Sequence, residues 1–263
     1  MCLIILAHHT HPRIPLVLTA NRDEFFSRPT RPAEFWTECE GNPKILAGKD
    51  LTLGGTWLGL TNTGRFAAVT NIRNPDIQTP NSAKSRGLLT LDFLTGERSA
   101  ESYVDHILES GGNYAGFNLL VGDLTNMIYV TNQSTEPIVL KPGIYGLSNG
   151  ILDDPWPKVS IGKSALQQLL NRSSDPKPEA LLDIMTNRDI APDSELPQTG
   201  VPLALERTLS PSFILDRERD YGTRCTTALT ISDSNQVQFC EQNYNNDTSI
   251  QCRRLFSFEL SPA

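Results

Sequence analysis

A chain of 263 residues with 38% hydrophobic and 20% charged residues has the size and composition of an ordinary globular protein. Its formal net charge of −7 at pH 7 excludes the broadly basic surface that nucleic-acid binding requires. The sequence has neither a membrane-length apolar run nor the cationic start of a secretory signal. We therefore expect a cytoplasmic protein without an integral membrane segment, with reduced thiols at cysteines 2, 39, 225, 240 and 252.

Apolar runs separated by turn residues predict a series of β-hairpins along the chain. The paired runs are 3–7 with 16–19, 57–61 with 66–70, 118–121 with 127–131, and 228–231 with 236–240. Helical spacing predicts helices over 85–94, after Ser99, over 158–171 and over 179–187. The proline-rich segment 191–207 indicates one long loop. Together these patterns predict an α/β (α+β) fold with helices on the faces of antiparallel sheets, in a single domain over 1–263.

Cys2 stands directly after the initiator methionine, at the head of the first apolar run. One interpretation is a buried strand residue, because cysteine behaves as a small hydrophobe. The other is that removal of Met1 leaves Cys2 with a thiol and a free α-amine, whose reference pKa is about 7.7–8.0. That amine can take the thiol proton, so Cys2 would supply nucleophile and base together.

The tetrad Asn21-Arg22-Asp23-Glu24 closes the run that is predicted to pair with the Cys2 strand. A carboxylate there would hold the Cys2 amine, and an arginine would lower the pKa of the thiol. The alternative is a solvated strand end with ordinary ion pairs.

Three further polar residues adjoin predicted strands. Asn71 and Asn149 are candidate oxyanion donors, worth roughly 2.7–4 kcal/mol each, or ordinary turn residues. Arg224 would bind a substrate carboxylate or support the nucleophile, or form a surface ion pair. Histidines 8, 9 and 11 favour a turn over a metal site, because neighbouring strand residues face opposite ways, and no metal site is predicted.

Several of these stretches resemble one family. They are Met-Cys-Leu-Ile at 1–4, Asn-Arg-Asp-Glu at 21–24, Gly-Gly-Thr-Trp at 54–57, Thr-Asn at 70–71, Gly-Leu-Ser-Asn at 146–149 and Tyr-Gly-Thr-Arg at 221–224. This combination resembles the NRDE family, also called the transport and Golgi organisation protein 2 family. The resemblance implies a four-layer α-β-β-α sandwich like that of N-terminal nucleophile hydrolases. It also implies a link to haem trafficking, acyl-lipid metabolism or the secretory pathway.

A more distant similarity is to choloylglycine hydrolases, penicillin V acylase and the acid ceramidase group. It implies Cys2 as nucleophile, Arg22 and Asp23 as its supporting pair, and Asn71 with Asn149 at the oxyanion. Arg224 corresponds to a late arginine of those enzymes. Their arginine and aspartate are typically separated by two residues, whereas Arg22 and Asp23 are adjacent and would face opposite ways on a strand.

Two functions of different kinds follow. The first is an N-terminal cysteine hydrolase or acyltransferase that acts on a non-peptide amide or thioester of a small molecule. The alternative is a non-catalytic carrier for haem, acyl-CoA or a related amphipathic ligand, with haem as cargo and no resident cofactor. The candidate substrate-binding residues are Asn21, Glu24, Trp57 and Arg73.

Overall fold

Antiparallel strand pairing organises the chain in the computed structural model, which describes residues 2–36 and 44–261. Over these residues the strands form two seven-stranded sheets. The chain divides into two compact units. The first is Met1–Ser27, Arg73–Asp76 and Lys141–Phe258, and the second is Arg28–Ile72, Ile77–Leu140 and Glu259–Ala263. Cys39 lies outside the described residues, and a single domain stays a prediction.

The sheet of the first unit has the order β10-β1-β2-β12-β13-β14, with β11 beside β12. Its strands are β1 (Cys2–His11), β2 (Ile14–Phe25), β10 (Gly143–Leu147), β11 (Leu215–Asp216), β12 (Tyr221–Ile231), β13 (Gln236–Tyr244) and β14 (Ile250–Glu259). The predicted hairpins at both ends of the chain are confirmed as β1–β2 and β12–β13. β2 and β12 then pair with each other, so the first and last hairpins share one sheet.

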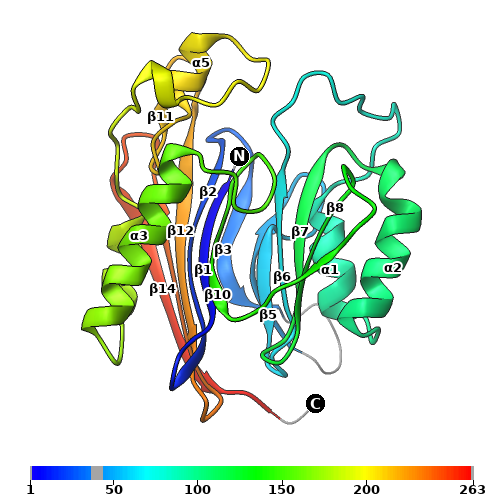
Figure 1. Cartoon of the computed structure of the whole chain (residues 1–263), viewed down its shortest axis with the longest axis vertical. Coiled ribbons are helices and arrows are strands. Elements are labelled where there is room, and N and C mark those ends of the chain that lie inside the picture. Colours follow the sequence, from blue (N-terminus) through cyan, green and yellow to red (C-terminus); the bar gives the residue numbers. More distant parts are fainter. Residues whose placement is uncertain (1, 37–43, 262–263) are drawn as a thin grey trace. The chain divides into compact units, whose positions relative to one another are not determined.

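Two longer helices of the first unit pack on its sheet. Helix α3 (Pro157–Arg172) contacts β1 and β10 (Figure 1). Helix α4 (Pro178–Ile184) contacts β2 and β12. Both begin with a proline in the first turn, where its fixed φ suits the helix and no N–H is lost from the hydrogen-bond ladder.

The prediction of one loop over 191–207 is wrong in two places. A 3-10 turn, η2 (Asp193–Glu195), and a short helix, α5 (Leu203–Thr208), lie in or extend from this segment. Pro202 is the N-cap residue of α5, one position before the helix, whereas α3 and α4 have proline as their first helical residue. Leu205 of α5 packs against a small cluster of Leu209, Ile214 and Tyr221, which holds the helix on the unit.

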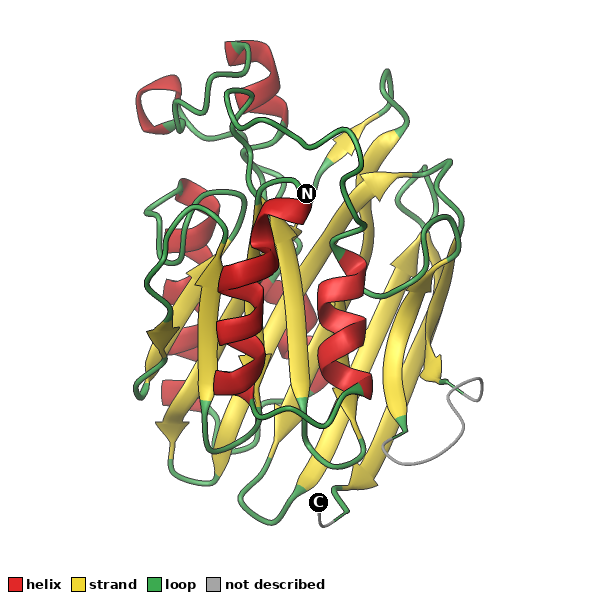
Figure 2. Ribbon diagram, turned by 90° about the vertical axis from the view of Figure 1, so that its right-hand side faces the viewer, coloured by secondary structure: helices red, strands yellow, loops and turns green. Residues whose placement is uncertain are grey.

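The second unit is a sheet with the order β3-β4-β5-β6-β7-β8-β9. Its strands are β3 (Thr30–Phe35), β4 (Ile45–Asp50), β5 (Leu58–Thr61), β6 (Phe66–Asn71), β7 (Phe117–Gly122), β8 (Met127–Thr131) and β9 (Ile138–Val139). Helices α1 (Gly87–Thr95) and α2 (Ala100–Ser110), followed by the turn η1 (Gly111–Asn113), pack on this sheet (Figure 2). Ser99 caps α2 as predicted, because its side chain accepts a hydrogen bond from Ser102 N.

The Gly-Gly-Thr-Trp stretch at 54–57 contacts and hydrogen-bonds the start of helix α1. Gly55 has φ +78°, and a Cβ there would lie 2.3 Å from the carbonyl oxygen of Gly87 at the start of α1. Thr56 N donates to that same oxygen at 3.2 Å, and Thr90 Oγ1 of α1 donates to Thr56 O. Trp57 packs against the hydrophobic core of the second unit. This stretch therefore has a clear structural role.

Across residues 2–36 and 44–261, none of the helices has both the length and the hydropathy needed to cross a membrane.

Candidate active site

Cys2 is the first residue of β1 and lies directly opposite Arg22 of β2. The register of β1 and β2 pairs Cys2 with Arg22, and the register of β2 and β12 pairs Arg22 with Cys225. Residues directly opposite each other point to the same face of a sheet. The side chains of Cys2, Arg22 and Cys225 therefore form one row, with Arg22 on the central strand between the two cysteines.

The Cys2 thiol is buried, with 7% of the residue exposed. Burial raises the pKa of the thiol, and the Asp23 carboxylate raises it further. The Arg22 charge and a hydrogen bond from the Asp23 backbone N–H to the sulfur act in the opposite direction but do not cancel the effect of burial. The thiol is therefore favoured in its neutral form, and it needs a base before it can act as a nucleophile.

Asp23 projects from the other face of the same sheet. Asp23 and Asn21 are two residues apart on β2, so their side chains point to the same face of the sheet. On that face the Asn21 side chain donates to backbone oxygens at the end of α4 and beyond it. Asp23 Oδ1 accepts a 2.7 Å hydrogen bond from Thr223 Oγ1, and its backbone oxygen accepts one from the Tyr221 hydroxyl at 3.0 Å. Because β2 runs antiparallel to β1, Asp23 also lies beside the nitrogen end of Cys2. The adjacency of Arg22 and Asp23 thus places one by the thiol and the other by the amine end.

Burial of Asp23 has a direct electrostatic consequence. The residue is 2% exposed, and burial raises the pKa of its carboxyl group, while Lys158, the Thr223 hydrogen bond and Arg22 oppose that rise. Lys158, in the first turn of α3, was not singled out from the sequence. The only sequence signal for it is a basic residue where the helix dipole disfavours positive charge.

Asn149 follows β10, which pairs with β1 on the side away from β2. β10 pairs with β1 through Ile4 and Leu147, and continuing that register two residues places Asn149 opposite Cys2. Ser148 Oγ donates to the backbone oxygen of Cys2 at 3.0 Å, which ties the two segments together. Asn149 is fully buried. An amide beside the nucleophile is suited to stabilise an oxyanion, which is the role predicted for it.

Arg224 occupies a bulge in β12, between Thr223 and Cys225. Its Nη1 donates to the backbone oxygen of Phe25 at 2.7 Å, and its guanidinium lies 5.4 Å from the Phe26 ring centroid. Burial lowers the pKa of Arg224, and the Arg22 charge lowers it further. The bulge therefore brings Arg224 close to the Cys2–Arg22 row, and the role that the resemblance implies for it stays a prediction.

Two other residues of the tetrad have internal partners. Glu24 Oε2 lies 3.7 Å from Arg22 Nη2. The Asn21 amide donates to Met185 O at 2.9 Å and Ser212 O at 2.8 Å, and its oxygen accepts from Thr226 Oγ1 at 2.6 Å. Asn21 thus connects β2, β12 and the segment after α4. Substrate binding by either residue stays a prediction.

Arg73 belongs to a buried ion pair. Its Nη2 lies 2.8 Å from Glu206 Oε2 of α5, and its guanidinium lies 4.6 Å from the Trp156 ring centroid. Its backbone N–H donates to the backbone oxygen of Asn149 at 2.7 Å. Burial lowers the pKa of Arg73, and Glu206 opposes that shift. Arg73 therefore links α5 to the segment that carries Asn149, and sequence analysis did not predict Glu206 or Trp156 as its partners.

Asn71 and Trp57 belong to the second unit. Asn71 ends β6 opposite Phe117 of β7, and Trp57 accepts a backbone hydrogen bond from Val69 N at 2.8 Å. Their predicted roles in the oxyanion site and in substrate binding stay predictions.

The histidines of β1 differ in exposure. His8 is buried, whereas His9 is exposed with φ +49° at a bulge of β1. In the part of the chain that is described, no group of three or more His, Cys, Asp or Glu side chains is arranged to hold a metal ion.

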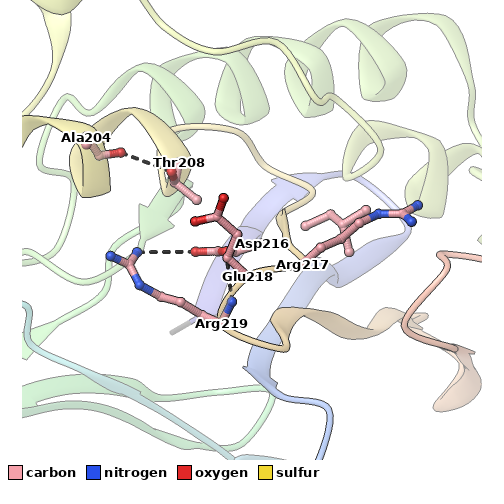
Figure 3. A pocket seen from close by; sticks show the side chains of 7 residues that line it. Ala204, Thr208, Asp216, Arg217, Glu218 and Arg219 are labelled. Carbon is pink, nitrogen blue, oxygen red and sulfur yellow. Dashed lines mark hydrogen bonds and ion pairs between the residues drawn. The ribbon is translucent and has the colours of Figure 1, made fainter.

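A pocket of about 480 Å³ opens between α5 and the turn at residues 216–219 (Figure 3). Its acidic and basic side chains balance, and Asp216 pairs with Arg219 at 3.2 Å. None of the predicted site residues lines this pocket.

Comparison with solved structures defines the class of fold. A mutant conjugated bile acid hydrolase from Clostridium perfringens superposes with a TM-score of 0.55 over 99% of this chain and 92% of that chain, at 11% identity. The N-acylethanolamine-hydrolyzing acid amidase ortholog of Caenorhabditis elegans gives a TM-score of 0.51 over 87% and 92%, at 10% identity. The fold is therefore of the N-terminal nucleophile hydrolase type, as predicted.

The family described as Transport and Golgi organisation 2 matches residues 1–246, and the chain belongs to this family. The human Transport and Golgi organization protein 2 homolog is 34% identical over 279 residues, covering 99% of both chains. The Drosophila melanogaster Transport and Golgi organization protein 2 is 27% identical over 264 residues, covering 92% of each. The predicted family membership is confirmed.

Proposed function

We propose that this protein is an N-terminal cysteine hydrolase or acyltransferase that acts on a non-peptide amide or a thioester. The observation that carries the proposal is the position of Cys2, opposite Arg22 and with the Asp23 backbone N–H at its sulfur. The solved relatives named above hydrolyse conjugated bile acids and N-acylethanolamines, according to their names. Both substrates are amides of small molecules, which supports the same class here.

The reaction requires removal of Met1, which frees the α-amine of Cys2. That amine takes the proton of the thiol, and the sulfur attacks the acyl carbon of the substrate. The tetrahedral intermediate then collapses to a thioester on Cys2, and the amine or thiol leaving group departs with the proton. Water, or another acceptor in the case of transfer, attacks the thioester and regenerates the thiol.

The surrounding residues have distinct parts in this proposal. Arg22 stabilises the thiolate as it forms, because a cation beside sulfur favours its charged form. Asp23 orients the α-amine, a role that its position on β2 supports. Asn149 and backbone N–H groups stabilise the oxyanion, a role in which one donor is worth roughly 2.7–4 kcal/mol. Asn71 belongs to the second unit and stays a predicted oxyanion donor.

Acyl transfer to Cys2 gives a direct test. The purified protein is incubated with fatty-acyl amides and acyl thioesters, quenched in acid, and analysed by peptide mass spectrometry for acylated cysteine. We expect an acyl group on Cys2 and release of the free acid over time. Cys2→Ala should abolish both signals, whereas Cys240→Ala, which removes a buried thiol from β13, should retain both. Full turnover by Cys2→Ala would sink the proposal.

The carrier alternative predicts a different outcome. A carrier for haem, acyl-CoA or a related amphipathic ligand binds it saturably in equilibrium dialysis without forming a thioester on Cys2. Such binding by both the native protein and Cys2→Ala, with no acylation, would favour the carrier.

We also propose a cytoplasmic location, which the free thiols of Cys2, Cys225, Cys240 and Cys252 support. Fractionation of native cells tests this proposal, and recovery of the protein in a secretory compartment would contradict it.

A further inference from the structure

Ser148, the residue between β10 and Asn149, contacts two groups of the candidate site with one hydroxyl. Its Oγ donates to the backbone oxygen of Cys2 at 3.0 Å and to Asn149 Oδ1 at 3.3 Å. A serine hydroxyl carries a single proton, so the two oxygens share it in a three-centre hydrogen bond. Because only 2% of Ser148 is exposed, bulk water has little access to either contact.

Neither of these hydrogen bonds belongs to the backbone ladder. The ladder between β10 and β1 ends at the pair of Leu147 with Ile4. The Cys2 carbonyl, two residues nearer the start of the chain, therefore receives a side-chain donor where a longer strand would supply a backbone N–H. A longer β10 would satisfy that carbonyl but would offer no hydroxyl to Asn149, so strand pairing alone does not account for the serine.

The main chain around Asn149 is fixed on both sides. Asn149 O accepts a 2.7 Å hydrogen bond from Arg73 N. In the turn that follows, Asp154 Oδ2 accepts from Ile151 N at 2.9 Å, and a Cβ on Gly150 would lie 1.9 Å from that same oxygen. The orientation of Asn149 therefore depends on its side-chain torsions, and the contact with Ser148 restricts these.

The Ser148 contact also determines which end of the Asn149 amide faces which way. The amide oxygen faces the Ser148 hydroxyl, so the NH2 group points away from it. If the amide were rotated by half a turn, its oxygen would take the place of the NH2 group. A developing oxyanion is stabilised by donors, and an amide oxygen is an acceptor only.

We propose that Ser148 is a positioning residue for the reaction at Cys2, whose hydroxyl holds the Asn149 amide with its NH2 group presented to the oxyanion and links that amide to the main chain of the nucleophile. The inference rests on the proposed function, because it assigns Ser148 a part in the same reaction. In this role Ser148 contacts neither the substrate nor the sulfur, and it acts through Asn149.

A double-mutant cycle tests the part of Ser148 in the reaction. With an acyl thioester as substrate, Ser148→Ala should lower kcat about 10-fold with little change in KM, because the amide loses its orientation but stays present. That loss is smaller than the roughly 100–1,000-fold that removal of an oxyanion donor costs. In an Asn149→Ala background, Ser148→Ala should cause almost no further loss of kcat, because the group through which it acts is gone.

Two further variants serve as controls for the cycle. Ser148→Thr keeps the hydroxyl and should retain most of the activity. Ser210→Ala should leave kcat unchanged, because Ser210 is also a buried serine of the first unit but its hydroxyl donates to Arg207 O at 2.8 Å. An unchanged kcat in folded Ser148→Ala, or an equal fold-loss with and without the Asn149 amide, would overturn the inference.

The order of the Asn149 amide gives a readout that needs no substrate. In protein labelled with ¹⁵N-asparagine, the side-chain NH2 signal of Asn149 is assigned by its loss in Asn149→Ala. Relaxation measurements should give an order parameter of about 0.85 for this group in the native protein and below about 0.6 in Ser148→Ala. An equally rigid group in Ser148→Ala would overturn the inference. If that variant does not fold, a mobile NH2 group in the native protein would overturn it, and a rigid one in both the native protein and Ser148→Thr would support it.

The outcomes separate this inference from the proposed function. Acylation of Cys2 together with a mobile Asn149 amide, or with an additive cycle, contradicts the role of Ser148 alone. A protein that never acylates Cys2 contradicts the enzyme, whereas loss of amide order in Ser148→Ala still supports the orienting contact between Ser148 and Asn149.

Discussion

Thr223 Oγ1 donates a 2.7 Å hydrogen bond to Asp23 Oδ1 and accepts one of 2.9 Å from Ile214 N. One hydroxyl therefore connects the candidate site to the segment that follows α5. Both partners are buried, so neither bond can be replaced by water without a local opening of the structure.

We expect Thr223→Val to destabilise the protein by about 1–3 kcal/mol, because two buried polar groups lose a partner while the volume is nearly unchanged. The pKa of Asp23 should rise further, since the lost hydrogen bond favours its charged form. Chemical denaturation measures the stability. Thr208→Val is the control, because the Thr208 hydroxyl bonds only within α5, to Ala204 O, and an equal loss there would contradict this account.

The buried pair of Arg73 and Glu206 predicts a non-additive mutant cycle. Removal of one charge leaves the other buried, so Glu206→Gln should cost about 3 kcal/mol of unfolding free energy. The double variant Arg73→Met with Glu206→Leu should cost less than the sum of Arg73→Met and Glu206→Leu made singly.

An exposed pair in the same segment serves as the control for that cycle. Asp193 pairs with Arg207 across η2 and α5, with about half of each side chain exposed. The denaturation midpoint of Asp193→Asn should equal that of the native protein within the precision of the measurement. An additive cycle at Arg73 and Glu206 would contradict the prediction.

Lys158 predicts a specific dependence of stability on pH. Its pKa in the folded protein is about 8, below the ordinary value of 10.5, so the native state binds fewer protons than the unfolded state between these values. The stability that depends on the lowered pKa of Lys158 is therefore fully present above pH 10.5 and is lost as the pH falls through 8. Relative to Lys158→Met, the native protein should gain on the order of 3 kcal/mol between pH 8 and 10.5. Urea denaturation at several pH values measures this difference, and a difference that stays flat would refute it.

Alanine substitutions at two neighbouring glycines distinguish the cost of backbone strain from the cost of a steric clash. Gly54 and Gly55 both have positive φ, at +74° and +78°, but only Gly55 faces a backbone atom, Gly87 O. Gly54→Ala should cost about 1–2 kcal/mol through the left-handed conformation alone. Gly55→Ala should cost clearly more, because α1 must move. Equal losses in thermal unfolding would show that α1 does not depend on this contact.

The sequence was most informative where burial follows a regular period. The β1–β2 hairpin was predictable because apolar runs on both sides of a turn are buried in one sheet. The turn between β5 and β6 and the Ser99 cap of α2 likewise allowed elements of the second unit to be predicted. β14 was missed because it lies at the end of its sheet and is largely exposed on both faces, so Arg253 and Arg254 disrupt any alternation. β3 was missed for a similar reason, since Pro32 interrupts the strand pattern.

The site was predictable only in part, because its geometry depends on register and burial. Cys2 and Arg22 could be placed on paired strands, but their direct opposition depends on the β1–β2 register. Arg224 approaches the row through a bulge that no sequence signal marks. Lys158 and Glu206 look like surface residues of polar helices, and only the packing of α3 and α5 shows that they are buried.

The central claim is that Cys2 is the free N-terminal residue and carries the acyl group. The most direct measurement is the intact mass and N-terminal sequence of the protein purified from its native host, before and after incubation with an acyl thioester. The account predicts loss of Met1, a free amine on Cys2, and a mass increase of one acyl group at that residue. Retained Met1 or a blocked amine, with no acylation of Cys2, would contradict it.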